Sequence, residues 1–310
     1  MKKIFIDGKE GTTGLRIFDR LQVRTDLEIV TLPEDLRKDP AARRDAIHGS
    51  DVSFFCLPDA AAVESAALAE GSDTVLIDTS TAHRTATGWA YGFPELGADF
   101  RAALTQSRRI AVPGCHASGF IALVRPLVEA GLLSADAQLT CHSITGYSGG
   151  GKKMIAQYEA DGRDPLLDAP RQYGLTQQHK HLPEMQKITG LTEAPVFCPI
   201  VSDFYSGMTV TVPLFRAELA AGCSVDDLRA VYAGLYTGPV VTYQAQADQN
   251  GFISGASRTG LDSMVVTVAG NDDRILLIAQ YDNLGKGASG AAIQCLNLAL
   301  GAEETAGLTL

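Results

Sequence analysis

The sequence predicts an α/β protein built from a doubly wound parallel sheet and a second, α+β domain whose sheet is mostly antiparallel. The first observation is an alternation of short apolar strand-like segments with helical patterns before residue 114, which is typical of parallel sheets. The second is a succession of longer segments rich in β-branched residues after residue 137, with few helices between them. The third is the length of 310 residues, which accommodates two ordinary domains.

The strands of the first sheet are expected where short apolar runs end in turn-forming residues. They span residues 3–7, 27–32, 52–56, 74–78 and 109–112, and residues 60–69 form one of the helices between them. In such sheets ligands bind at the carboxyl ends of the strands. The loops that follow residues 7, 56 and 78 are therefore expected at a binding site.

The second sheet is expected from the longer β-branched segments. They span residues 138–145, 194–200, 207–215, 240–245, 263–269 and 274–280, and residues 225–236 form the clearest helix among them. A last helix over residues 291–300 is rich in small residues and can pack back on the first domain. We therefore expect a dinucleotide-binding domain of residues 1–114 plus 282–310 and a catalytic domain of residues 115–281.

Composition excludes several classes of protein. The formal net charge of −10 argues against binding to nucleic acid or to anionic membranes. We expect a soluble, cytoplasmic protein, since neither a signal peptide nor an apolar stretch of about 20 residues is found. The six cysteines are dispersed and form no C-x-x-C pair, and the histidines lack the spacing of metal ligands, so no disulfide framework and no metal site is expected.

A glycine-rich turn follows the first expected strand. It contains Gly8, Gly11, Thr12, Thr13 and Gly14 and precedes a helical pattern over residues 15–21. Such a turn lets the backbone approach a pyrophosphate, which then sits at the helix N-terminus. The spacing G-x-x-G-x-x-G differs from the commoner G-x-G-x-x-G, but its place between strand and helix favours dinucleotide binding.

The choice between NAD and NADP stays open at this level. After the second strand, Glu34 and Asp35 could bind ribose hydroxyls, whereas Arg37 and Lys38 could hold a 2′-phosphate. The same four residues could equally form a solvated charged loop. Thr12 and Arg16 are further candidates for phosphate contact.

Cys115 is the strongest candidate for a nucleophile. It follows a strand and the turn Pro113-Gly114 and opens an apolar helical pattern that runs to residue 132. In the first turn of a helix, unpaired N–H groups and the helix dipole favour a thiolate over a thiol. A thiolate suits covalent catalysis at neutral pH.

Five motifs in one order carry a resemblance to a known family. They are the turn at residues 8–14, the segments YGFPE (91–95), PGC (113–115) and QHKHLPE (178–184), and DNLGKGA (282–288). Together they resemble N-acetyl-γ-glutamyl-phosphate reductases of the shorter type, which are related to aspartate-semialdehyde dehydrogenases and glyceraldehyde-3-phosphate dehydrogenases. The resemblance covers essentially the whole chain. It implies a semialdehyde dehydrogenase-like fold and the NADPH-dependent reduction of an acyl phosphate to an aldehyde and phosphate, a step of arginine biosynthesis.

The resemblance also implies roles at the reacting centre. Cys115 forms a thioester, and the backbone N–H groups at the start of its helix are donors for the oxyanion. We favour His181 as the acid/base and His179 as a substrate-orienting partner, with the order open; on an extended segment the two would share a face. His116 is the rival, but successive helical side chains diverge by about 100°, so it is expected to point away from the substrate.

Anionic substrate and cofactor groups require further contacts. Arg84 is the best candidate for the substrate phosphate, with Ser80 beside it. Ser148 and Gly149 lie in a Gly-rich turn suited to anions, and the family pattern places Asn283 at the nicotinamide end of NADP(H). The expected partners are a small acyl phosphate, inorganic phosphate and further copies of the chain in a dimer or tetramer.

Two other functions remain open from the sequence. One is a related semialdehyde dehydrogenase that acts on an aspartyl or amino-carrier-linked substrate. The other is a regulator that binds NADP(H) without catalysis, although Cys115 and both histidines of the His-x-His motif survive here.

Overall fold

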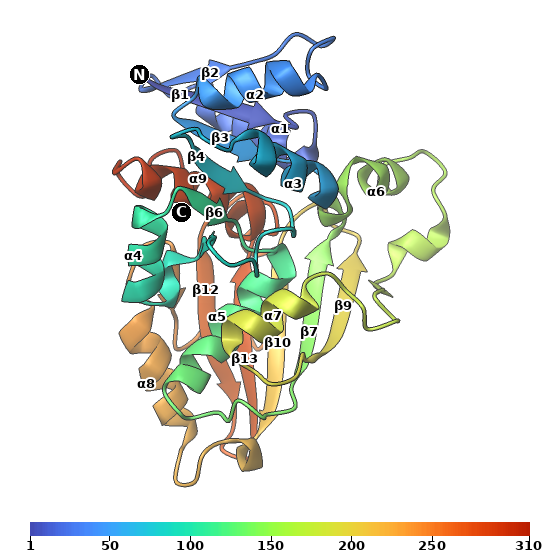
Figure 1. Cartoon of the computed structure of the whole chain (residues 1–310). Helices are drawn as coiled ribbons and strands as arrows, with labels where there is room; N and C mark the ends of the chain where they lie inside the picture. The colour runs from blue at the N-terminus through green and yellow to red at the C-terminus, as the bar shows by residue number, and fades with distance from the viewer. The chain divides into compact units, whose positions relative to one another are not determined.

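The computed structural model describes all 310 residues and divides them into two compact units. The first contains Met1–Pro94, Ala98–Pro113 and Ala288–Leu308, and the second contains Glu95–Gly97, Gly114–Gly287 and Thr309–Leu310. Each unit has its own sheet and its own helices (Figure 1). The chain therefore crosses between the units next to Cys115 and again beside Gly287.

The first unit contains a six-stranded sheet whose strands all run parallel. Its order is β2-β1-β3-β4-β6-β5, so the chain reverses its direction of growth between β1 and β3, the point where such sheets bind ligands. The strands are β1 (Lys2–Asp7), β2 (Leu27–Val30), β3 (Val52–Phe55), β4 (Val75–Asp78), β5 (Ala90–Tyr91) and β6 (Arg109–Ala111). This confirms the predicted parallel sheet.

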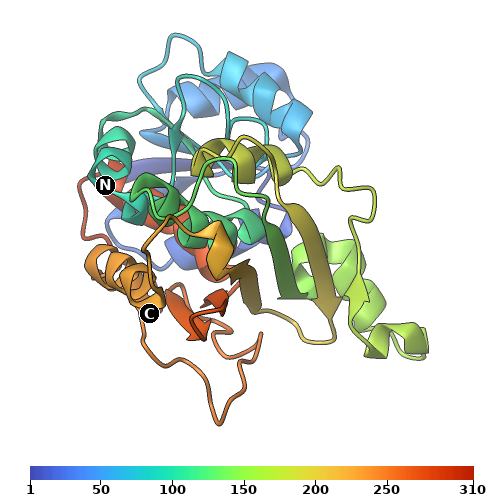
Figure 2. The same cartoon turned by 90° about the horizontal axis from the view of Figure 1, so that it is seen from below.

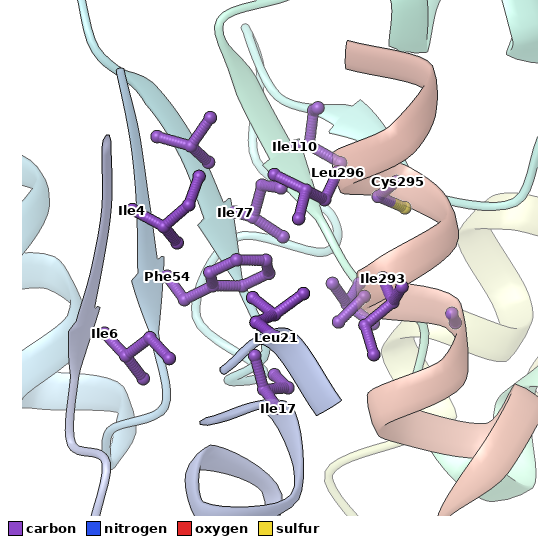
Figure 3. Close-up of a cluster of buried hydrophobic side chains, with 14 of the residues drawn as sticks. Ile4, Ile6, Ile17, Leu21, Phe54, Ile77, Ile110, Ile293, Cys295 and Leu296 are labelled. Carbon is purple, nitrogen blue, oxygen red and sulfur yellow. The ribbon is translucent and has the colours of Figure 1, made fainter. Parts of the chain in front are cut away.

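Helices cover both faces of this sheet because alternate strand residues point to opposite sides. On one face, Phe54 packs with side chains of α1 (Thr12–Leu21) and α9 (Gly290–Ala299), and Figure 3 shows Ile293 and Leu296 of α9 directed toward the sheet. On the other face, Phe55 packs with α2 (Pro40–His48) and α3 (Asp59–Leu68). A further helix, α4 (Ala98–Gln106), contacts α9.

The second unit contains a seven-stranded mixed sheet of order β11-β12-β13-β10-β7-β9-β8. Four neighbouring pairs are antiparallel, whereas β11–β12 and β7–β9 are parallel, so the prediction of a mostly antiparallel sheet is confirmed (Figure 2). The strands are β7 (Thr140–Gly146), β8 (Arg171–Gln172), β9 (Val196–Ser202), β10 (Met208–Phe215), β11 (Val241–Tyr243), β12 (Met264–Gly270) and β13 (Arg274–Tyr281).

Helix α5 (Cys115–Glu129) is the centre of the second unit. It is buried along most of its length and packs on β10, on β13 and on α7 (Leu182–Thr189), as Figure 1 shows. Helix α8 (Val225–Leu235) was predicted within one residue, whereas α6 (Gly151–Tyr158) was not, because two glycines precede it, a third begins it, and glycine weakens a helical pattern. No helix in either unit combines the length and the apolar character needed to cross a bilayer.

Candidate active site

In the first unit, the glycine-rich turn joins β1 to α1 as predicted. Gly8 has φ +85°, and a side chain on Gly14 would lie 2.5 Å from the carbonyl oxygen of Gly8. Gly11 caps α1 without a side-chain hydrogen bond, and the first turn of the helix holds no acidic residue. The N–H groups around Thr12 and Thr13 are thus presented to an anion at the carboxyl end of β1.

The loop after β4 is tied down by its own side chains. Ser80 donates from its hydroxyl to Asp78 Oδ2 (2.7 Å), and His83 Nδ1 lies 2.6 Å from the same oxygen. Arg84 is 8% exposed and donates to the carbonyl oxygens of Val112 (2.9 Å) and Thr79 (3.0 Å). Ser80 and Arg84 therefore hold this loop to the ends of β4 and β6, and their substrate contacts stay predictions.

The charged loop after β2 is solvated. Arg37 forms an ion pair with Glu34 at 2.7 Å, and the two side chains are 41% and 76% exposed. An exposed pair of this kind contributes little to stability.

In the second unit, Cys115 is the first residue of α5. Gly114 caps the helix, and its N–H donates to Glu184 Oε1 of α7 at 2.8 Å. The Glu184 side chain is almost fully buried, and its carboxyl oxygen supplies an acceptor for the N–H of the N-cap residue. Gly287 also approaches the nucleophile, since a side chain there would lie 3.1 Å from Cys115 Cβ.

Three histidine rings gather beside the start of α5. The ring centroid of His116 lies 5.7 Å from that of His181 and 5.9 Å from that of His179, and the centroids of His179 and His181 are 4.8 Å apart. His116 Nδ1 lies 2.6 Å from Ser143 Oγ, and its Nε2 lies 2.7 Å from the Tyr173 hydroxyl. Burial lowers the pKa of His116 to about 3, so its ring is neutral near pH 7.

The two histidines of the His-x-His motif do not lie on an extended segment. His181 has the helical angles φ −83° and ψ −14° and is the N-cap of α7, which Pro183 helps to start. Its N–H donates to Nδ1 of His179 at 3.2 Å. The turn brings the rings together, and it leaves the ring proton of neutral His179 on Nε2.

These histidines differ in their surroundings. His181 is 5% exposed, whereas His179 is half-buried. Burial, helped by the neighbouring Lys180, lowers the pKa of His179 below its usual value. No three His, Cys, Asp or Glu side chains are grouped so that they could hold a metal ion.

The predicted cofactor residues of the second unit meet around Asn283. Its Nδ2 donates to Ser148 Oγ (3.1 Å), and its Oδ1 accepts from the N–H of Gly207 (2.9 Å). A side chain on Gly149 would lie 3.4 Å from the same Nδ2. Asp282 is fully buried and accepts from Ser206 Oγ (3.0 Å), so the strand end that carries Asn283 is rigidly held.

Sequence reasoning missed Tyr173 and Glu95, and it missed the contacts that Glu184 and Lys286 make. Tyr173 was missed because an isolated tyrosine in a polar loop carries no pattern. Glu184 was assigned only a place in the first turn of its helix, although its bond to Gly114 fixes the turn before Cys115. Lys286 and Glu95 form a buried ion pair with two contacts of 2.8 Å. The two residues belong to different motifs of the sequence, and neither motif indicates that they pair.

Both units of the chain are similar to known proteins. The model of the semialdehyde dehydrogenase NAD binding domain matches residues 9–103, and the model of the semialdehyde dehydrogenase dimerisation domain matches residues 115–283. A protein from Chelativorans sp. (strain BNC1), named N-acetyl-gamma-glutamyl-phosphate reductase, is 46% identical over 306 residues, which are 96% of this chain and 98% of that protein. One of the same name from Sinorhizobium medicae is 44% identical over 97% of this chain and 99% of its own length.

The chain belongs to the N-acetyl-γ-glutamyl-phosphate reductase family of semialdehyde dehydrogenases. As a member of this family it is an enzyme, an oxidoreductase whose first unit contains an NAD binding domain. The family identified from the motifs is thus confirmed.

Solved structures share this fold. Aspartate semialdehyde dehydrogenase II from Vibrio cholerae superposes with a TM-score of 0.71 at 16% identity over 97% of this chain and 98% of that chain. The enzyme from Candida albicans, solved with NADP, has a TM-score of 0.62 at 16% identity over 97% of this chain and 99% of that chain. At such identities the likeness concerns the fold alone.

Proposed function

We propose that this protein reduces N-acetyl-γ-glutamyl phosphate with NADPH to N-acetylglutamate 5-semialdehyde and inorganic phosphate, as a step of arginine biosynthesis. The observation that carries the proposal is the match at 44–46% identity, over nearly the full chain, to proteins of that name. The site agrees, because the thiol, both histidines and the glycine-rich turn are all present.

The glycine-rich turn fits a dinucleotide. Its helix start has no capping side chain and no acidic residue, and glycine at residue 14 permits the tight turn, since a side chain there would lie 2.5 Å from the carbonyl oxygen of Gly8. Gly8, Gly11, Thr12, Thr13 and Gly14 would hold the pyrophosphate, and Asn283, with Ser148 and Gly149, would meet the nicotinamide end. When bound, the reduced nicotinamide supplies a hydride.

Cys115 carries the covalent chemistry in this proposal. Its thiolate attacks the acyl carbon, a thioester bond forms, the bond from carbon to the phosphate oxygen breaks, and phosphate leaves with that electron pair. Two electrons arrive at the thioester carbon as hydride, the carbon–sulfur bond breaks, and the aldehyde and the thiolate are released. The N–H groups in the first turn of α5 are positioned to stabilise the oxyanions.

The histidines serve proton transfer and orientation. His181, almost fully buried on the N-cap of α7, is our candidate for the acid/base that protonates the departing group and receives the proton from the thiol. His179 holds its ring proton on Nε2 and can donate it to the substrate as an orienting group. Arg84 and Ser80 remain candidates for the substrate phosphate.

We also propose that the protein works as a homodimer or tetramer in the cytoplasm. The second unit matches a dimerisation domain, and the face of its sheet away from α5 carries half-exposed apolar side chains such as Ile144 and Leu276. Six free cysteines suit a reducing compartment.

The test runs the reaction in reverse. Purified protein is mixed with NADP⁺, phosphate and N-acetylglutamate 5-semialdehyde, and NADPH formation is followed by absorbance. We expect a rate that requires phosphate and falls roughly a thousandfold or more in Cys115→Ser, since the nucleophile is lost. Cys223→Ser is the matched control and keeps the rate. Activity only with aspartate semialdehyde, or none with NADP⁺ bound, would overturn the proposal.

A further inference from the structure

Three tyrosine hydroxyls donate to main-chain carbonyl oxygens of α5. Tyr236 donates to Ala122 (2.6 Å), whose usual helical donor is absent because residue 126 is proline. Tyr232 donates to Leu123 (2.5 Å), and Tyr281 donates to Cys115 (2.5 Å). All three side chains are almost completely buried, but only the Tyr281 hydroxyl binds the residue that carries the nucleophile.

Tyr281 makes a second bond to the same helical turn. Its hydroxyl accepts from the N–H of Gly119 at 3.0 Å, so it bridges the carbonyl of Cys115 and the amide four residues later. A side chain at residue 119 would lie 2.7 Å from this hydroxyl. Glycine at residue 119 is therefore what admits the tyrosine to the first turn of α5.

The bridge acts on the peptide group that follows the thiol. A donor on the Cys115 carbonyl polarises the Cys115–His116 peptide and strengthens its N–H as a donor at the helix start. Burial, followed by the nearby charge of a Cys115 thiolate, raises the pKa of Tyr281 well above its usual value, so the hydroxyl keeps its proton throughout the working range.

We propose that the Tyr281 hydroxyl is a positioning group for catalysis, which by bridging Cys115 and Gly119 fixes the first turn of α5 and keeps the Cys115 thiol reactive. Strand β13 ends at Tyr281, and the chain continues directly into Asp282 and Asn283. One strand end thus holds the nucleophile's backbone and, on the proposed function, also presents the amide of Asn283 to the cofactor.

Other titratable groups surround this turn and remain in the variants described below. Three of them, Tyr173, His179 and His181, lie in the segment before α7. The others are Glu184 on α7, Cys141 on β7 and His116 on α5. The matched comparison therefore removes a single oxygen and leaves these titratable groups in place.

The experiment compares Tyr281→Phe with Tyr232→Phe. The Cys115 peptide is followed by mass spectrometry during alkylation with iodoacetamide between pH 6 and 10, with the Cys223 peptide as internal reference. We expect Tyr281→Phe to alkylate at Cys115 about three- to tenfold more slowly at pH 7, with the pH profile shifted upward, and Tyr232→Phe to match the native protein. The unfolding midpoints of both variants are measured, since each variant loses one buried hydroxyl that donates to a carbonyl oxygen of α5.

Steady-state kinetics provide the second readout. In Tyr281→Phe, kcat should fall about tenfold while KM for the semialdehyde stays within twofold, because the reacting group and not substrate binding is disturbed. Native alkylation and native kcat in Tyr281→Phe would overturn the proposal, as would an equal effect of Tyr232→Phe. The kinetic part rests on the proposed function. Alkylation needs no substrate, so a shifted profile supports the bridge even where the proposed substrate fails.

Discussion

Helices α1 and α5 begin in nearly the same way and are held very differently. Each follows a parallel strand and a glycine-containing turn, each has a glycine N-cap in extended conformation, and neither has a capping side chain or an acidic residue in its first turn. The start of α1 is held by the close fit of Gly8 and Gly14. The start of α5 is held by Glu184 on the N-cap and by Tyr281 on the first residue.

This difference separates a binding site from a catalytic site. Open N–H groups on a glycine-rich turn suit a phosphate, which supplies the missing acceptors when it arrives. A nucleophile must instead be placed before the substrate binds, because a small displacement of a reacting group is costly. One pattern of strand, glycine turn and helix therefore serves both purposes, and side chains distant in sequence decide which.

The largest effect is expected from a substitution that disrupts the close packing of the glycine-rich turn before α1. Gly14→Ala puts a methyl group 2.5 Å from the Gly8 carbonyl oxygen and 3.0 Å from Lys9 Cα, so the turn must open. We expect KM for NADPH to rise roughly tenfold to a hundredfold. Gly11→Ala is the matched control, since its methyl group would meet atoms only at 3.5 Å and beyond. Equal KM values for the two variants would contradict this view of the turn.

A smaller effect is expected at the start of α5, where Glu184 bonds to the N-cap residue. Glu184→Ala removes the acceptor of the Gly114 N–H, which should lower kcat about tenfold and the free energy of unfolding by about 2 kcal/mol. Glu184→Gln keeps an acceptor and should retain more of both. The comparison fails if Glu184→Ala changes KM for NADPH but leaves kcat alone.

The last effect concerns the acid stability of the second unit and leaves the activity near pH 7 unchanged. His116 has a pKa of about 3 in the folded chain and 6.5 in the unfolded chain, so between these values the unfolded chain binds the extra proton. The free energy of unfolding should therefore rise with pH across this window, by up to about 1.4 kcal/mol per pH unit from this group. The lowered pKa of His179 acts in the same direction.

Urea unfolding of the native protein and of His116→Asn at pH 4.5, 5.25 and 6 tests this slope. Circular dichroism reports both units, whereas the single tryptophan, Trp89, reports the first. We expect the variant to lose most of the slope in the circular dichroism and little in the tryptophan signal. An unchanged slope in circular dichroism would argue against a buried neutral His116.

The sequence predicted what local patterns determine. Alternation of strands and helices predicted the first sheet, and the longer β-branched segments predicted the second. The position of Cys115 at a helix start followed from the turn and the apolar period after it. The contacts that brace Cys115 could not be predicted. Tyr281 lies 166 residues away in sequence and Glu184 lies 70 residues from Gly114, so only the folded sheet and α7 bring them together. Arg84 shows the same limit, since its bonds to two carbonyls follow from tertiary structure.

The proposed mechanism requires that Cys115, at the start of α5, forms a thioester, and a single-turnover measurement detects this intermediate. The protein is mixed rapidly with NADP⁺ and N-acetylglutamate 5-semialdehyde without phosphate, and the NADPH released in the first turnover is counted. We expect a burst of about one NADPH per chain, an acyl group on the Cys115 peptide by mass spectrometry, and neither in Cys115→Ser. NADPH formation that needs phosphate from the first turnover, with Cys115 unmodified, would contradict it.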